Sequence, residues 1–281
     1  MSALFSVDGP PLTDAALQLD GRERVFYIAA EPIQWDYAPT GADLCRGDAQ
    51  PFTAEQSVFV EAGPLRFGST YIKARYVQYT DDRYTTAVPR SDDEEHLGLL
   101  GPLLRAEVGD TVVIHLVNNL DVPVSMHTHG ALYNKSSEGT PYADGEGANP
   151  GAAVPPGGRH TYVWKIPDRA APGPAEGSSK LWMYHSHTHE VEDTYAGLVG
   201  GMVVTARGMA DEEGRPKDVD RCVLILLLLF CYTLCAKSWC CFADTMLKRV
   251  HCAGSWDAIC DIICDVSASG DGRYTGSMRY L

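Results

Sequence analysis

Residues 109–119 read GDTVVIHLVNN, a short apolar run with turn-forming residues at both ends. Val and Ile favour strands, whereas Gly, Asp and Asn are depleted in strands and favour turns. This stretch therefore predicts a strand over residues 111–117 that is closed by a turn on each side. Similar runs occur at residues 25–28, 71–79, 161–166 and 198–205.

Composition agrees with a fold built from short strands. The chain has 281 residues, of which 45% are hydrophobic, with 27 Gly and 17 Pro. We therefore expect an all-β sandwich or barrel with a sizeable core, and we find no heptad, internal repeat or long amphipathic helix. Two Gly- and Pro-rich stretches, residues 135–158 and 167–179, predict long loops. The net charge of −14 argues against nucleic acid and anionic lipid as partners.

Two His-x-His pairs carry the chemistry. They stand in MHTHG at residues 126–130 and in WMYHSH at residues 182–187, each at the end of a strand-like run. Residues i and i+2 of a strand point to the same face, so each pair offers two imidazoles side by side. If the two strands are neighbours, four imidazoles converge. The candidate ligands are His127, His129, His185 and His187.

Imidazole ligands favour a transition metal. Neutral imidazole suits copper, zinc and nickel, and the affinity order favours Cu(II). Neither motif contains a carboxylate, which argues against magnesium or calcium. Partly exposed strand histidines without a metal are the alternative, and the repetition of the pair argues against it. We expect His189 to lie outside the cluster, because the strand should end before it.

Several segments resemble the multicopper oxidases of the ceruloplasmin/hephaestin (ferroxidase) type. They are LGLLGPLLRAEVGD at residues 97–110, WDY at 35–37, YVQYTD at 76–81, AGLVG at 196–200 and DVDR at 218–221. They occur in the family's order, and the resemblance covers about residues 22–221. It implies a cupredoxin-like (plastocyanin-like) Greek-key β-sandwich with long loops, together with an irregular C-terminal tail.

We accordingly divide the chain into a loosely ordered leader (1–21), a cupredoxin domain (22–207), a linker (208–221) and a Cys-rich tail (222–281). Eight of the nine cysteines lie in the tail, and only Cys45 precedes it. The apolar run 222–236 is shorter than the ~20 residues of a membrane-spanning helix. It is open to three interpretations: a membrane anchor, a buried strand or helix, or sequence that is not the native continuation, which we favour. The first thirty residues show no signal peptide.

The resemblance also implies roles for the four histidines. His127 would bind the type 2 copper, and His129, His185 and His187 would bind the type 3 copper pair. Dioxygen would be the oxidant and Fe(II) the reducing substrate, in an extracellular or plasma-membrane-associated protein. The relatives carry a disulfide where Ser179 and Thr205 stand here.

The family's complete trinuclear site needs eight histidines, and this sequence supplies four. The rest would come from missing C-terminal cupredoxin domains or another chain. We find no type 1 copper constellation of Cys, two His and Met, so whether this chain alone is an enzyme stays open. The alternatives are a non-catalytic copper-binding module and an interaction module like the A domains of coagulation factors V and VIII. A zinc hydrolase ranks lower, because no general base accompanies the histidines.

Overall fold

The computed structural model describes residues 13, 17–45, 48–142 and 149–219. Most of the expected leader and all of the tail, including the apolar run 222–236, lie outside the described residues. Within the described part, no helix is long and apolar enough to cross a membrane. The chain divides into two compact units, and Pro32–Lys73 belong to the second unit, whereas residues 17–31 and 74–219 belong to the first. The domain boundaries at residues 21, 207 and 221 stay predictions.

Strands dominate the described residues. The strands are β1 (Glu23–Asp36), β2 (Ala62–Gly63), β3 (Arg66–Phe67), β4 (Thr70–Tyr79), β5 (Leu104–Glu107), β6 (Thr111–Asn118), β7 (His127–Thr128), β8 (Arg159–Lys165), β9 (Ser179–His185) and β10 (Val199–Thr205). The α-helices are α1 (Ala54–Val60) and α2 (Glu190–Ala196). Short 3-10 turns are η1 (Asp92–Leu97), η2 (Lys135–Ser137), η3 (Pro150–Ala152) and η4 (Asp168–Ala170).

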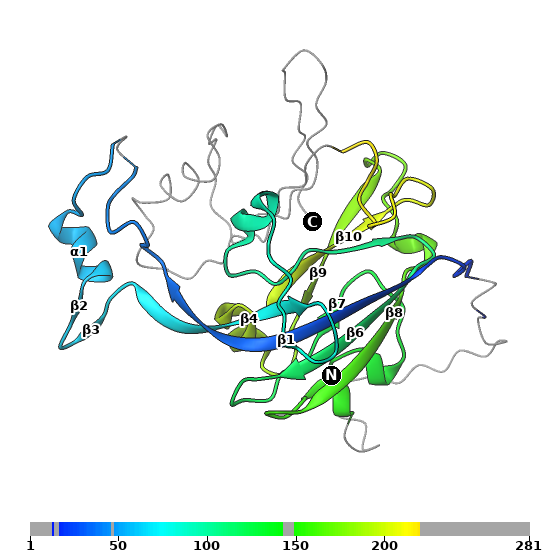
Figure 1. The fold of residues 1–281 in the computed structure, drawn as a ribbon, viewed down its shortest axis with the longest axis horizontal. Helices are drawn as coiled ribbons and strands as arrows, with labels where there is room; N and C mark the ends of the chain where they lie inside the picture. Colours follow the sequence, from blue (N-terminus) through cyan, green and yellow to red (C-terminus); the bar gives the residue numbers. More distant parts are fainter. Residues whose placement is uncertain (1–12, 14–16, 46–47, 143–148, 220–281) are drawn as a thin grey trace, which may run out of the picture. The chain divides into compact units, whose positions relative to one another are not determined.

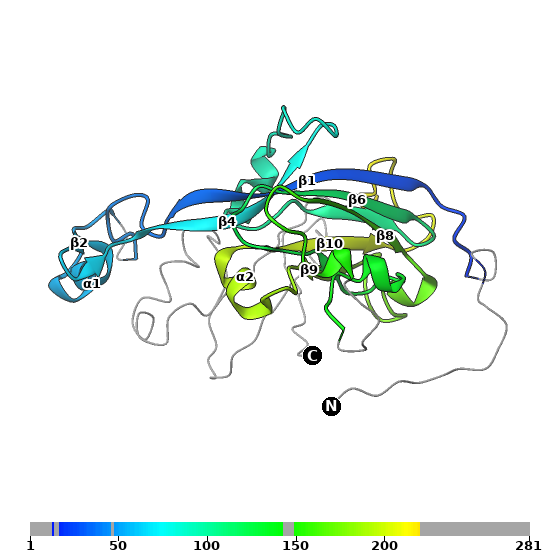
Figure 2. The ribbon, with the colours of Figure 1, turned by 90° about the horizontal axis from the view of Figure 1, so that it is seen from below.

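Two four-stranded sheets carry the first unit. One has the order β4-β1-β6-β8 and the other the order β5-β10-β9-β7 (Figure 1). β1 and β6 are parallel, as are β5 and β10, whereas β6–β8, β9–β10 and β7–β9 are antiparallel. Figure 2 shows β1, β6 and β8 in one layer over β9 and β10 in the other. The expected all-β, cupredoxin-like sandwich is confirmed.

The core lies between these layers. Trp164 and Tyr162 of β8 and Ile114 and Leu116 of β6 are at most 1% exposed, as is Met202 of β10. β6 is buried along most of its length, because β1 and β8 flank it on both edges and the second sheet covers one face. This position explains why its sequence is a continuous apolar run and not an alternating one.

Each of the expected strands coincides with an observed one, although their ends differ, and the structure contains further strands that were not expected. β1 continues to Asp36, well past the apolar run 25–28, and β5 was not expected at all. The predicted loop at residues 135–158 contains η2 and η3. Ser179 and Thr205 are directly opposite each other in the β9–β10 ladder, which is where the relatives' disulfide would connect two strands.

The second unit has its own local stabilisation. Thr53 caps α1, since its hydroxyl accepts a hydrogen bond from the Gln56 N–H while the Gln56 side chain accepts one from the Thr53 N–H. The Gln56 amide also donates to the buried Asp43 carboxylate at 2.9 Å. The hairpin of β2 and β3 leaves Leu65 and Phe67 almost fully exposed.

A buried carboxylate ties three strand ends together in the first unit. Asp110, in the turn between β5 and β6, is 2% exposed. Its Oδ1 accepts from the Arg22 N–H at 2.7 Å, and its Oδ2 accepts from the Glu107 N–H at 2.8 Å. The same carboxylate pairs with the guanidinium of Arg24 on β1. Removing it would leave a buried cation and two backbone donors unsatisfied.

We therefore expect Asp110→Ala to lower the free energy of unfolding by about 3–5 kcal/mol, the usual cost of breaking a buried ion pair from one side. Urea unfolding followed by circular dichroism measures this change. The control is Asp20→Ala, which breaks the exposed contact between Asp20 and Arg207 and should leave stability unchanged within error. Equal stability of the two variants would contradict the structural role of Asp110.

Candidate metal centre

The pairing of β7 with β9 brings the two histidine motifs together. His127 stands opposite His185, and Thr128 stands opposite Tyr184. The His129 N–H extends this pairing by donating to the Met183 carbonyl at 2.9 Å. The expectation that the motifs lie on neighbouring strands is confirmed. However, β7 ends at Thr128 and β9 ends at His185, so His129 and His187 lie just beyond the strands.

A close contact between Gly130 and Trp182 explains the residues that flank the pairs. Gly130 has a φ of +74°, and a Cβ at this position would lie 2.2–2.6 Å from three atoms of the Trp182 indole. Only glycine allows the backbone to pass over the ring at this distance and with this conformation. The Gly after the first pair and the Trp before the second are therefore two halves of one contact.

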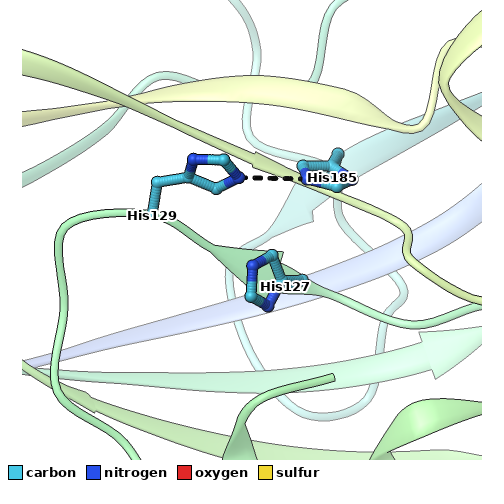
Figure 3. A group of neighbouring side chains, drawn as sticks. All are labelled: His127, His129 and His185. Atoms are coloured by element: carbon cyan, nitrogen blue, oxygen red, sulfur yellow. Dashed lines mark hydrogen bonds between the residues drawn. The ribbon is translucent and has the colours of Figure 1, made fainter. Parts of the chain in front are cut away.

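Three of the four imidazoles form a tight group. One ring nitrogen from each of His127, His129 and His185 lies within 4.8 Å of the others. The Nε2 atoms of His129 and His185 are 3.2 Å apart, and Figure 3 shows the three rings turned toward one another. The His187 ring centroid is 5.2 Å from that of His127 and 5.6 Å from that of His185. All four histidines singled out in the sequence thus gather in one place.

Backbone carbonyls orient two of these rings. His127 Nδ1 is 2.7 Å from the Glu138 carbonyl oxygen, and His185 Nδ1 is 2.9 Å from the Ser186 carbonyl oxygen. A carbonyl only accepts, so each Nδ1 carries the proton and donates it. The unprotonated Nε2 of each ring is then the metal-binding atom, an arrangement typical of histidine ligands. In this structure His185 Nε2 accepts a hydrogen bond from His129 Nε2 at 3.2 Å, which a bound metal would replace.

The surroundings keep two of the rings neutral. The ring of His129 is only partly covered, but the desolvation of this part, followed by the nearby rings of His185 and His127, lowers its pKa to about 4. Burial is also the main cause that lowers the pKa of His185, and His127 adds to it. Both imidazoles are therefore unprotonated near pH 7, which is the form that binds metal.

Residues outside the two motifs complete the site. Glu190 Oε2 lies 3.5 Å from His187 Nε2, so a carboxylate borders the cluster, although neither motif contains one. Its position, three residues after His187, was visible in the sequence, but nothing there marked it. His189 is the N-cap residue of α2 and is not one of the three histidines of the tight group. His115 lies on β6 and contacts Thr161 at 2.9 Å.

The donor set fits copper. The three closest donors are imidazole nitrogens with no carboxylate oxygen among them, which suits a borderline transition metal and disfavours magnesium and calcium. Two of the rings have their tautomers set by carbonyl acceptors, so they need no rearrangement of protons to bind. Four imidazoles within one small volume exceed what a structural role requires.

Comparisons with known proteins agree with this geometry. A family model described as "Multicopper oxidase" matches residues 97–208, which include both histidine motifs. Ferroxidase HEPHL1 of Homo sapiens is 42% identical over 211 residues, covering 73% of this chain and 18% of that protein. Ceruloplasmin of Homo sapiens is 38% identical over 231 residues, covering 79% of this chain and 22% of that protein.

A third relative is the venom prothrombin activator pseutarin-C non-catalytic subunit of Pseudonaja textilis. It is 36% identical over 210 residues, covering 74% of this chain and 13% of that protein. The chain spans about a fifth of the length of the ferroxidase and ceruloplasmin relatives. With the two histidine pairs, the all-β sandwich and these similarities together, the chain belongs to the multicopper oxidases of the ceruloplasmin type.

Proposed function

We propose that this chain is an N-terminal copper-binding domain of a ferroxidase-like multicopper oxidase and supplies half of a type 2/type 3 trinuclear copper site. His127 is the type 2 ligand of this proposal, and His129, His185 and His187 are the type 3 ligands. The observation that carries it is the convergence of the two His-x-His pairs through the β7–β9 pairing. Imidazole nitrogens suit both copper and zinc, and the similarity to multicopper oxidases favours copper.

An open side of the cluster supports the idea of a half-site. His129 is exposed in this chain, and His127 and His187 are half-buried, whereas His185 is buried. In this proposal one ring serves the type 2 copper and three rings serve the type 3 pair, so each copper ion would need further ligands. The proposed source of the remaining histidines is a set of C-terminal cupredoxin domains or another chain, which would cover this side.

The chain's own residues would orient the ligands and exclude competing protonation. Copper supplies one-electron redox chemistry, which lets several metal ions share the four electrons that dioxygen takes up. The Glu138 carbonyl accepts from His127 Nδ1 and the Ser186 carbonyl accepts from His185 Nδ1, so Nε2 of each ring is left unprotonated as the ligand atom. The lowered pKa of His129 keeps that ring available as a ligand.

Fe(II) is the proposed reducing substrate, because the HEPHL1 relative is named a ferroxidase. The proposed location is extracellular or associated with the plasma membrane, as the family resemblance implies. The acidic surface, with a net charge of −14, is compatible with the attraction of cations.

A non-catalytic interaction module is the second candidate. It is favoured by the similarity to the non-catalytic subunit of the venom activator. An interaction module does not need converging imidazoles with prearranged tautomers, so the four histidines favour the copper-binding role. Copper binding by the chain separates the two candidates directly.

We expect the purified chain to bind Cu(II) and the quadruple variant His127→Ala, His129→Ala, His185→Ala and His187→Ala to lose this binding. The reason is that the variant removes every imidazole of the cluster. Equilibrium dialysis with metal analysis gives the stoichiometry, and electron paramagnetic resonance detects nitrogen ligands. The control variant His96→Ala with His115→Ala removes histidines outside the cluster and should bind as the wild type does. Unchanged copper content in the quadruple variant would refute the assignment.

We expect the copper-loaded chain, tested alone, to show no sustained Fe(II) oxidation. Substrate electrons enter such oxidases at a type 1 centre of Cys and His ligands. In the described part of the chain the group of metal-binding side chains consists of histidines only. Oxygen uptake together with Fe(III) formation measures turnover, with the same amount of free Cu(II) as the control. Multiple turnovers per chain above that control would overturn this expectation.

A further inference from the structure

A chain of buried hydrogen bonds lies directly under the histidine cluster and connects its two segments. The Ser125 N–H donates to Ser186 Oγ at 3.1 Å, and Ser186 Oγ donates to Asp193 Oδ2 at 2.5 Å. In the opposite direction, the His187 N–H donates to Ser125 Oγ at 2.9 Å. Both serines are fully buried, and Asp193 is 6% exposed. The two segments are thus joined twice outside the β7–β9 ladder.

Asp193 is the anchor of this network. Its Oδ2 also accepts from the His189 N–H at 3.1 Å, which fixes the start of α2. Its backbone carbonyl accepts from the N–H groups of Gly197 and Leu198 at the end of the same helix. The Ser186 N–H donates to the Leu198 carbonyl at 3.0 Å, so the residue between the second pair of histidines is held from both ends.

Tyr76 holds the network from the other sheet. Its hydroxyl donates to the Ser125 carbonyl. Burial raises the pKa of Tyr76 well above its usual range, so the phenol stays protonated and remains a donor. Each of the backbone polar groups of Ser125 therefore has a partner, and Ser125 cannot shift without breaking bonds to both sheets.

This network restrains His187, the candidate ligand that lies beyond the end of β9. β9 ends at His185, so no ladder hydrogen bond fixes the backbone of His187. The bond from the His187 N–H to Ser125 Oγ provides that restraint, and Ser125 precedes the first histidine pair by two residues. Burying a carboxylate is costly unless hydrogen bonds compensate for the lost water. An apolar side chain in place of Asp193 could fill the same space but could not accept the hydrogen bonds from Ser186 and His189. The carboxylate therefore fixes the positions of these two residues.

We propose that Asp193 is a positioning residue that acts through Ser186 and Ser125 to set how closely His187 approaches His127 and His185. The proposal rests on the copper-binding function proposed above. Metal sites tolerate displacements of only about 0.5 Å in their ligands. Loss of the network should therefore remove His187 from the imidazoles that bind copper, while His127, His129 and His185 remain.

The test compares the variants Asp193→Ala and Asp193→Asn with the wild type, each as the complete 281-residue chain. The Cu(II) affinity and the electron paramagnetic resonance spectrum of the bound Cu(II) are measured for each. In Asp193→Ala both donors lose their acceptor, and we expect affinity to fall by about tenfold or more, with a spectrum that reports one fewer nitrogen ligand. In Asp193→Asn the amide oxygen can accept both bonds, so we expect the affinity to stay close to that of the wild type. An Asp193→Ala variant with wild-type affinity and spectrum would overturn the proposal.

Ser125→Ala gives an independent readout that does not depend on folding of the Asp193 variant. It removes only the acceptor of the His187 N–H, and it should reproduce the spectral change. The matched control is Val204→Ala, a fully buried core position on β10, which should lower thermal stability but leave the spectrum unchanged. The same spectral change in this control would show a general effect of destabilisation and refute positioning. Failure of the wild-type chain to bind copper would instead refute the proposed function.

Discussion

The pairing of β7 with β9 is the constraint on which the rest of the site depends. It is only two residues long, yet it sets His127 opposite His185. A slip by one residue would turn every side chain of the slipped strand to the other face of the sheet and separate the imidazoles. The register is held because β9 is also paired over seven residues with β10, whose side chains belong to the core. The metal centre is thus positioned by the sandwich as a whole.

Beyond the ends of β7 and β9, contacts other than the strand-pairing hydrogen bonds position the chain. The contact of Gly130 with the Trp182 ring sets the path of the chain after the first pair. The buried hydrogen bonds among Ser125, Ser186 and Asp193 set the path of the chain around the second histidine pair. Both are short-range and directional, which suits a site whose ligands must meet within a few tenths of an ångström. The apolar core provides stability, and these contacts provide position.

Two buried carboxylates in the first unit, those of Asp110 and Asp193, have the same structural role: each accepts several buried hydrogen bonds. Asp110 joins strand ends and pairs with an arginine, whereas Asp193 accepts from a serine hydroxyl and a backbone N–H under the histidines. Each satisfies donors that an apolar residue would leave unpaired. The cluster itself has one open side, where His129 is exposed. This exposure agrees with the proposal that the domain shares its metal site with ligands from elsewhere.

Much of this could be predicted from the sequence because it depends on local patterns. Turn-bounded apolar runs such as residues 111–117 indicated an all-β sandwich, and the repeated His-x-His pairs indicated four clustered ligands. The ends of β1 and the existence of β5 could not be predicted, because strand ends depend on the neighbouring strand. Tertiary structure alone decided the roles of Asp193, the Glu138 carbonyl and Glu190. The Glu138 carbonyl is a backbone atom that no side-chain pattern marks. Asp193 and Glu190 lie close in sequence to their partners Ser186 and His187, but only the turn after β9 and the start of α2 bring these side chains together.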